Sequence, residues 1–93
     1  MNGSMHRVID RAARPVMLTV ENLRHRWEDE GDYEDWKDYE DALRVAVELA
    51  GMSYIESRQQ PFGVVVRMRM VQPEVLIWSH ADRNGWTIEG GAR

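Results

Sequence analysis

The feature that most constrains the fold is a change in the spacing of apolar residues at Gly51. Before Gly51, apolar residues recur every three or four positions, as on one face of an α-helix. After it, Val64 and Val66 alternate with Val65 and Arg67, as in a β-strand with one packed side and one wet side. The sequence therefore predicts an α+β fold, with two to three helices first and a sheet second.

The segment before residue 30 predicts two short helices. The first is expected over 5–13, between an N-cap at Ser4 and a stop at Pro15. The second is expected over 20–29 and ends near Gly31. These helices would leave a break in the middle of the segment.

The clearest helix is predicted over 33–50, with Asp32 as its N-cap and Gly51 as its stop. Its apolar residues advance by three or four positions: Trp36, Tyr39, Leu43, Ala46, Val47 and Ala50. We expect this helix to lie across the apolar face of the sheet. Residues 16–20 have two interpretations, either a short strand or the start of the second helix.

The second half of the chain predicts a three-stranded antiparallel meander. Its strands are expected over 64–71, 74–80 and 86–89, with a break at Gln72-Pro73. The Asn84-Gly85 pair before the last strand is a strong signal for a tight hairpin. The connection over 53–61 contains Tyr54 and Ile55, and its pattern does not decide whether a strand begins there.

The length of 93 residues predicts a single domain over 1–93, with flexible ends at 1–4 and 90–93. A domain of this size buries a smaller fraction of its surface on folding than a larger domain does. Formation of a homodimer would therefore increase its stability. The chain has no cysteine, which excludes a disulfide scaffold and a thiolate metal site. It also has no apolar run of about 20 residues, so we expect no membrane segment and a cytoplasmic location.

The net charge of −4 hides a strongly acidic segment, residues 28–41. This segment holds nine carboxylates and one lysine, a local charge of −8, so the rest of the chain carries +4. A dense acidic surface favours docking on a basic protein, above all one that binds nucleic acids. The residues expected to bind such a partner are Glu28, Asp29, Asp32, Glu34, Asp35, Asp38 and Asp41, with Tyr33 and Tyr39 at the edge.

Catalytic and metal-binding patterns do not emerge from the sequence. The acidic segment does not match the ligand spacing of an EF-hand, and His6, His25 and His80 fall in different predicted elements. Neither a phosphate-binding glycine loop nor a strained serine elbow is present. We therefore expect a non-enzymatic protein with no cofactor and no metal.

Two function hypotheses follow. The first is a small inhibitor or adaptor, similar in size and composition to phage-encoded anti-restriction and anti-CRISPR proteins, although no motif ties the chain to a family. Arginine outnumbers lysine eleven to one, which fits a GC-rich bacterial or phage genome. The less favoured alternative is a regulator that contacts nucleic acid through a sheet surface near Trp78 and His80. Its expected binding residues are Arg67, Arg69, Arg83 and Trp86.

Overall fold

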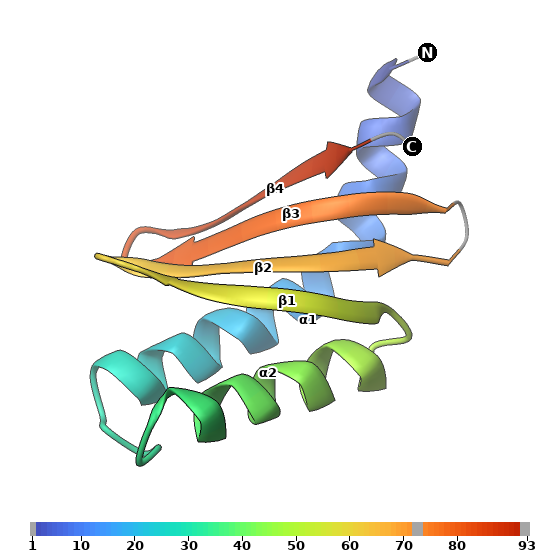
Figure 1. Ribbon diagram of the computed structural model, residues 1–93. Helices are drawn as coiled ribbons and strands as arrows, with labels where there is room; N and C mark the ends of the chain where they lie inside the picture. Colours follow the sequence, from blue (N-terminus) through green and yellow to red (C-terminus); the bar gives the residue numbers. More distant parts are fainter. Residues whose placement is uncertain (1, 72–73, 92–93) are drawn as a thin grey trace.

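The computed structural model describes residues 2–71 and 74–91, which form two helices and a four-stranded antiparallel sheet (Figure 1). The elements are α1 (Asn2–Glu28), α2 (Trp36–Leu49), β1 (Ser53–Gln60), β2 (Gly63–Met70), β3 (Val75–Asp82) and β4 (Gly85–Gly91). The strands lie in the order β1-β2-β3-β4, so each pairs with its neighbour in the chain. The predicted α+β class is confirmed, whereas the prediction of three strands is wrong.

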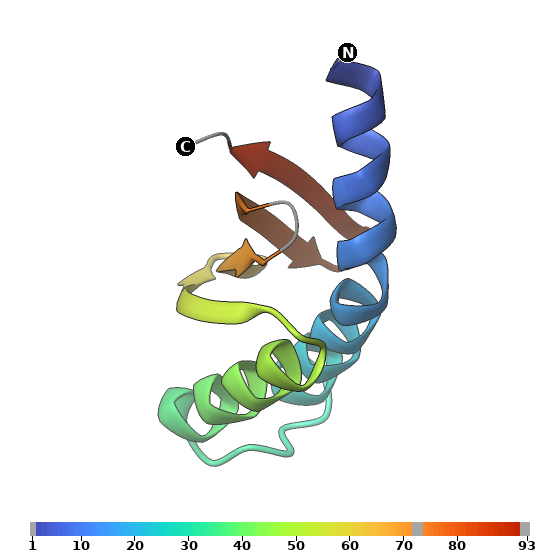
Figure 2. The same ribbon diagram turned by 90° about the vertical axis from the view of Figure 1, so that its right-hand side faces the viewer.

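Helix α1 is a single helix that continues through Pro15, so the predicted stop there is wrong. A proline inside a helix removes one backbone hydrogen bond and costs about 3 kcal/mol. Burial on both sides of Pro15 outweighs this cost, because Ala13, Val16 and Met17 all lie in the core. The axis of α1 changes direction in its middle, as expected of a helix that contains proline (Figures 1 and 2).

The start of α1 also differs from the prediction. The helix begins at Asn2, so Ser4 is inside it rather than at its N-cap. Residues 16–20, for which a short strand was an alternative, are helical as well. The long helix forms because one apolar stripe runs through both predicted helices and packs on the same core.

Helix α2 confirms the predicted apolar face but starts later than expected. Its N-cap is Asp35, whose side chain accepts a hydrogen bond from the backbone N–H of Asp38 at 3.0 Å. Asp32, the predicted cap, lies instead in the loop before the helix. The helix ends just before Gly51, whose φ of 86° is a conformation that favours glycine.

Strand β1 occupies most of the segment that the sequence left undecided. Its pairing with β2 shifts register between Tyr54 and Glu56, and this bulge interrupts the alternation of inward and outward residues. At the other end of the sheet, β4 includes Gly90 and Gly91, which we expected in a frayed tail. The predicted break at 72–73 and the terminal residues 1, 92 and 93 lie outside the described residues.

Both helices cover the same face of the sheet, α1 against β3 and β4 and α2 against β1 (Figure 2). The predicted two sides of β2 are confirmed. The helix side carries the buried residues Val64, Val66, Met68 and Met70. The opposite side of the sheet, which we call the open face, carries the outward-facing residues of all four strands: Glu56, Arg58, Gln60, Val65, Arg67, Arg69, Leu76, Trp78, His80, Asp82, Thr87 and Glu89. Within the described residues, neither helix has the length and apolar character needed to cross a membrane.

Candidate functional site

The acidic segment forms the corner between α1 and α2, where much of its charge is neutralised. Four of its carboxylates lie within 4 Å of an arginine nitrogen: Glu28 beside Arg24, Asp29 beside Arg83, Asp32 beside Arg26 and Asp41 beside Arg44. Glu30 lies 3.2 Å from the ring of His25. The acidic surface is therefore smaller and weaker than the sequence indicates.

Four carboxylates of this segment have no such partner, and one of them, Glu40, accepts hydrogen bonds from the hydroxyls of Tyr54 and Ser57 at 3.2 and 3.1 Å. Within the described part of the chain, Glu34, Asp35 and Asp38 have no Arg, Lys or His nitrogen within 4 Å. All three are exposed and lie around the start of α2. Asp35 already serves as the N-cap, so Glu34 and Asp38 are the carboxylates that remain available to a partner.

The two tyrosines that we expected at the edge of the acidic surface have different surroundings. Tyr39 is 0% exposed, so the expectation that it contacts a partner is wrong. Its ring stacks on Trp27 with 5.3 Å between the ring centroids and also contacts Trp36. Tyr33 is half-buried at the rim of this aromatic cluster, and the guanidinium of Arg26 lies 5.5 Å from its ring. The cluster packs the corner between the helices, with Tyr39 buried and the other three rings, Trp27, Tyr33 and Trp36, partly buried.

Burial also changes the chemistry of Tyr39. It raises the pKa of the Tyr39 hydroxyl, and the negative charge of Glu28 raises it further. The hydroxyl oxygen is buried and has no hydrogen-bond partner in the described structure. Tyr39 is thus a core residue that carries an unsatisfied polar atom.

The residues expected to contact nucleic acid are not brought together. Arg67 and Arg69 lie on the open face, as predicted. Trp86 points to the helix side of β4, where it packs on the core with the guanidinium of Arg14 5.2 Å from its ring. Arg83 lies in the turn between β3 and β4 and contacts Asp29. The predicted set therefore divides between two sides of the sheet and a turn.

The open face has its own aromatic centre at Trp78. The guanidinium carbon of Arg58 lies 5.1 Å from the centroid of the Trp78 ring, and that of Arg67 lies 4.8 Å from it. Arg67 is opposite Trp78 in the sheet register, whereas Arg58 reaches over from β1. Glu56 holds Arg67 through an ion pair of 3.4 Å. Trp78 thus lies in contact with two guanidinium groups on the uncovered side of the sheet.

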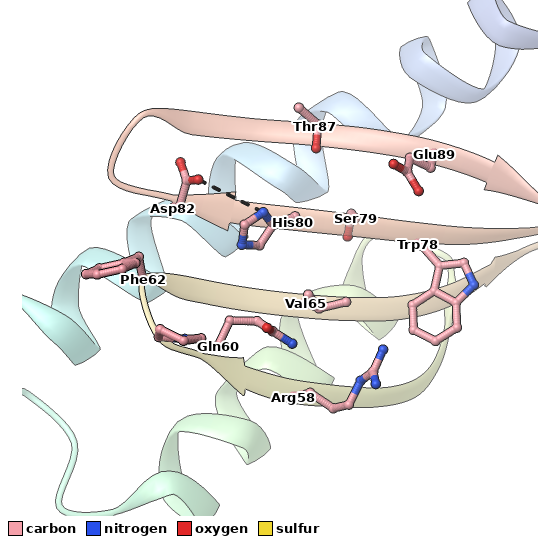
Figure 3. Close-up of a pocket in the computed structure, with 11 residues that line it drawn as sticks. Arg58, Gln60, Phe62, Val65, Trp78, Ser79, His80, Asp82, Thr87 and Glu89 are labelled. Atoms are coloured by element: carbon pink, nitrogen blue, oxygen red, sulfur yellow. Dashed lines mark ion pairs between the residues drawn. The ribbon is translucent and has the colours of Figure 1, made fainter.

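A hollow of about 740 Å³ lies beside Trp78 (Figure 3). It is lined by Arg58, Gln60, Pro61, Phe62, Val65, Trp78, Ser79, His80, Asp82, Thr87 and Glu89. Phe62, in the turn between β1 and β2, is 75% exposed at its rim. The volume falls in the range of small-ligand sites, and the lining mixes aromatic, cationic and carboxylate groups.

His80 lines the hollow between Val65 and Asp82. Its Nδ1 lies 4.0 Å from the carboxylate of Asp82. Its Nε2 is buried without a hydrogen-bond partner in the described residues. A Cβ on Gly63, across the β2–β3 pairing, would lie 2.9 Å from that nitrogen. Gly63 therefore makes the space in which the imidazole lies.

Sequence reasoning missed Arg58, Gln60 and Phe62, all of which line the hollow. Arg58 and Gln60 belong to the segment 53–61, whose strand was undecided because the bulge near Tyr54 removes the regular alternation there, and Phe62 follows directly after it. The available signal was the unbroken polar run from Glu56 to Gln60, which is followed by Pro61 and Gly63. Trp78 and His80 were placed near the alternative site by the sequence, and the structure puts both on the open face.

Within the residues that the structure describes, no group of three or more His, Asp or Glu side chains is arranged to hold a metal ion. Comparison with protein-family models, with curated proteins and with solved structures gives no match to this chain. Function therefore has to be argued from the geometry of the two surfaces described above.

Proposed function

We propose that this chain is a binding protein rather than an enzyme, and that its open face binds single-stranded nucleic acid. The observation that carries the proposal is the Trp78 ring flanked by Arg58 and Arg67 at 5.1 and 4.8 Å. Single strands are bound by proteins that combine aromatic rings with arginines, because every base offers a flat face to stack on. A base can stack on the outer side of either guanidinium or replace it on the ring.

The hollow beside Trp78 suits the rest of a nucleotide. Its volume of about 740 Å³ exceeds that of a single base, and Phe62 offers a second exposed ring. The carboxylates of Asp82 and Glu89 face the same space and can accept hydrogen bonds from the exocyclic amino groups of bases. The site thus combines stacking groups with hydrogen-bond acceptors.

The charge of the open face limits what phosphates can contribute. Arg67 and Arg69 lie within 4 Å of Glu56 and Glu74 respectively, so only part of their charge is free. With Arg58 included, at most about three phosphates are neutralised, which predicts a slope of log K against log salt no steeper than about −2. Stacking, rather than charge, is expected to supply most of the affinity.

The test is fluorescence anisotropy with labelled single-stranded DNA and RNA. Trp78→Ala should weaken binding about 5-fold to 100-fold, the usual worth of one stacked base, and Trp78→Phe should retain most of the affinity. Arg44→Ala is the matched control, because Arg44 is an exposed arginine on α2 that pairs with Asp41. If the wild-type chain binds neither strand, or if Trp78→Ala binds as tightly as Arg44→Ala, the proposal is wrong.

A second candidate function is docking of the corner between α1 and α2 on a basic protein. It is favoured by the exposed carboxylates of Glu34 and Asp38, which have no cationic partner among the described residues. Its test is the salt-sensitive retention of a basic protein from a host lysate. The double substitution Glu34→Lys and Asp38→Lys should abolish retention, whereas Trp78→Ala should leave it unchanged. Retention that survives the double substitution would exclude this candidate.

A further inference from the structure

The open face carries opposite charges on the two sides of Trp78. On the β1 and β2 side, the guanidinium carbons of Arg58 and Arg67 lie 5.1 and 4.8 Å from the centroid of the Trp78 ring. On the other side, Glu89 of β4 is directly opposite Trp78 in the sheet register, which places the Cβ atoms of the two residues about 5 Å apart. Figure 3 shows the Trp78 ring between Glu89 and Arg58. A group bound at Trp78 therefore meets cations on one side and a carboxylate on the other.

Glu89 is the carboxylate of the hollow that has both oxygens available. Asp82, which also lines the hollow, already accepts a hydrogen bond from the backbone N–H of Asn84 at 2.8 Å and lies 4.0 Å from the ring of His80. The Glu89 side chain is exposed and has neither a hydrogen bond nor an ion pair within the described residues. Its two oxygens are thus free to accept hydrogen bonds from a ligand.

Arg58 is the corresponding free donor on the opposite side of the hollow. Arg67 is held by Glu56 in an ion pair of 3.4 Å. Arg58 lines the hollow and contacts the Trp78 ring, but it has no carboxylate partner in the described part of the chain. The hollow thus presents a free pair of acceptors and a free fork of donors to the same ligand.

The bases differ in how well they match this arrangement. Guanine has two adjacent donors, N1–H and the N2 amino group, which fit the two oxygens of one carboxylate, and two adjacent acceptors, O6 and N7, which fit an arginine. Adenine and cytosine have a ring acceptor beside their amino group, so one carboxylate oxygen would face a lone pair. Thymine and uracil offer a single N–H between two carbonyl oxygens. Guanine is therefore the base whose donors match both oxygens of Glu89.

We propose that the hollow selects guanine in a bound single strand, with Glu89 accepting from N1–H and the N2 amino group and Arg58 donating to O6 and N7. This inference rests on the proposed function, because it concerns which base of the strand enters the site at Trp78. Phosphates are attracted to Arg67 and Arg69 on β2, away from Glu89, so the backbone does not compete for the carboxylate. A bidentate pair of this kind favours the matching base by about 5-fold to 150-fold in affinity.

The first test compares bases by fluorescence anisotropy. The labelled DNA strands have about eight thymidines, with guanosine, inosine or adenosine in place of one central thymidine, or with no replacement. The wild-type chain should bind the guanosine strand about 5-fold to 150-fold more tightly than the all-thymidine strand. Inosine lacks the N2 amino group, so the inosine strand should lose most of this preference, and the adenosine strand should show none.

The second test assigns the preference to Glu89. Glu89→Gln should abolish it, because the amide keeps one acceptor oxygen and replaces the other with a donor. Glu56→Gln is the matched control, because it removes the same charge from the open face at a residue that pairs with Arg67 and does not line the hollow. It should retain the ratio of guanosine to thymidine affinity. Circular dichroism establishes that both variants are folded.

The third test addresses Arg58 with 7-deazaguanine, which keeps both donors of guanine and lacks the N7 acceptor. The wild-type chain should bind the 7-deazaguanine strand about 2-fold to 10-fold more weakly than the guanosine strand, the usual worth of one hydrogen bond. Arg58→Ala should bind these two strands equally, whatever affinity it loses for both. If Arg58→Ala distinguishes them as the wild type does, Arg58 is not the donor and its assignment is overturned.

The remaining outcomes separate this inference from the proposed function. If the wild-type chain binds all the strands equally and Trp78→Ala binds all of them more weakly, guanine selection is overturned and the proposed function stands. A preference that survives Glu89→Gln, or that Glu56→Gln also removes, overturns the role of Glu89. If the wild-type chain binds none of the strands, the proposed function is overturned and guanine selection with it.

Discussion

Removing the hydroxyl of Tyr39 should stabilise the protein. The Tyr39 side chain is 0% exposed, and its hydroxyl oxygen is buried with no hydrogen-bond partner in the described structure. In the unfolded chain, water forms hydrogen bonds with that hydroxyl, and folding removes these bonds without replacing them. Tyr39→Phe keeps the ring that stacks on Trp27 and removes only the unsatisfied atom.

The magnitude follows from two opposing contributions. An unsatisfied buried hydroxyl lowers the free energy of unfolding by about 1–3 kcal/mol. Removing its oxygen leaves a small cavity, which cancels part of the gain. The net expectation for Tyr39→Phe is an increase of about 1 kcal/mol in the free energy of unfolding. For a domain of this size, that corresponds to a rise in Tm of about 4–8 °C.

The assay is urea unfolding of the wild type, Tyr39→Phe and Tyr54→Phe at neutral pH. Tyr54 is the matched control, because its hydroxyl contacts Ser57 Oγ at 2.6 Å and Glu40 Oε2 at 3.2 Å. Loss of these bonds should make Tyr54→Phe less stable by about 1 kcal/mol. If Tyr39→Phe is destabilised to the same extent as Tyr54→Phe, the hydroxyl of Tyr39 does make a hydrogen bond and the reasoning is refuted.

Tyr39 should also make the stability depend on alkaline pH. Burial, aided by Glu28, raises its pKa above the ordinary value of 10.0. Its contribution is therefore complete below pH 10 and is lost as the pH rises further, because the unfolded chain ionises first. The advantage of Tyr39→Phe over the wild type should grow above pH 10, by up to about 1.4 kcal/mol per pH unit. Urea unfolding at pH 8 and pH 10.5 measures this difference, and an advantage that stays constant would contradict it.

Three further substitutions test local features of the fold by urea unfolding. Asp35→Ala should cost about 1 kcal/mol because it removes the N-cap of α2, whereas Asp32→Ala should cost less than about 0.5 kcal/mol because its ion pair with Arg26 is exposed; equal costs would contradict the capping assignment. Gly63→Ala should cost about 2 kcal/mol or more, since the new Cβ would collide with the carbonyl oxygen of Ala81, and a neutral effect would show that the strands can separate there.

Local patterns were enough to predict most of the fold. The alternation along β2 and the helical stripe of α2 each depend on residues close in sequence, and both are confirmed by the burial of Val64, Val66, Tyr39, Leu43 and Val47. The errors came where tertiary packing outweighed a local rule. Burial on both sides of Pro15 keeps α1 continuous. The bulge in β1 breaks the alternation of its residues, so the strand could not be predicted from the sequence.

The candidate sites were harder to predict because their partners come from distant segments. The charge of the acidic segment could be counted, but its neutralisation depends on Arg83 from a turn more than fifty residues later and on Arg24 and Arg26 from the preceding helix. Likewise, Trp78 was expected near the alternative site, yet its contact with Arg58 requires β1 to pair with β2 and β2 to pair with β3. Composition alone does not contain this information.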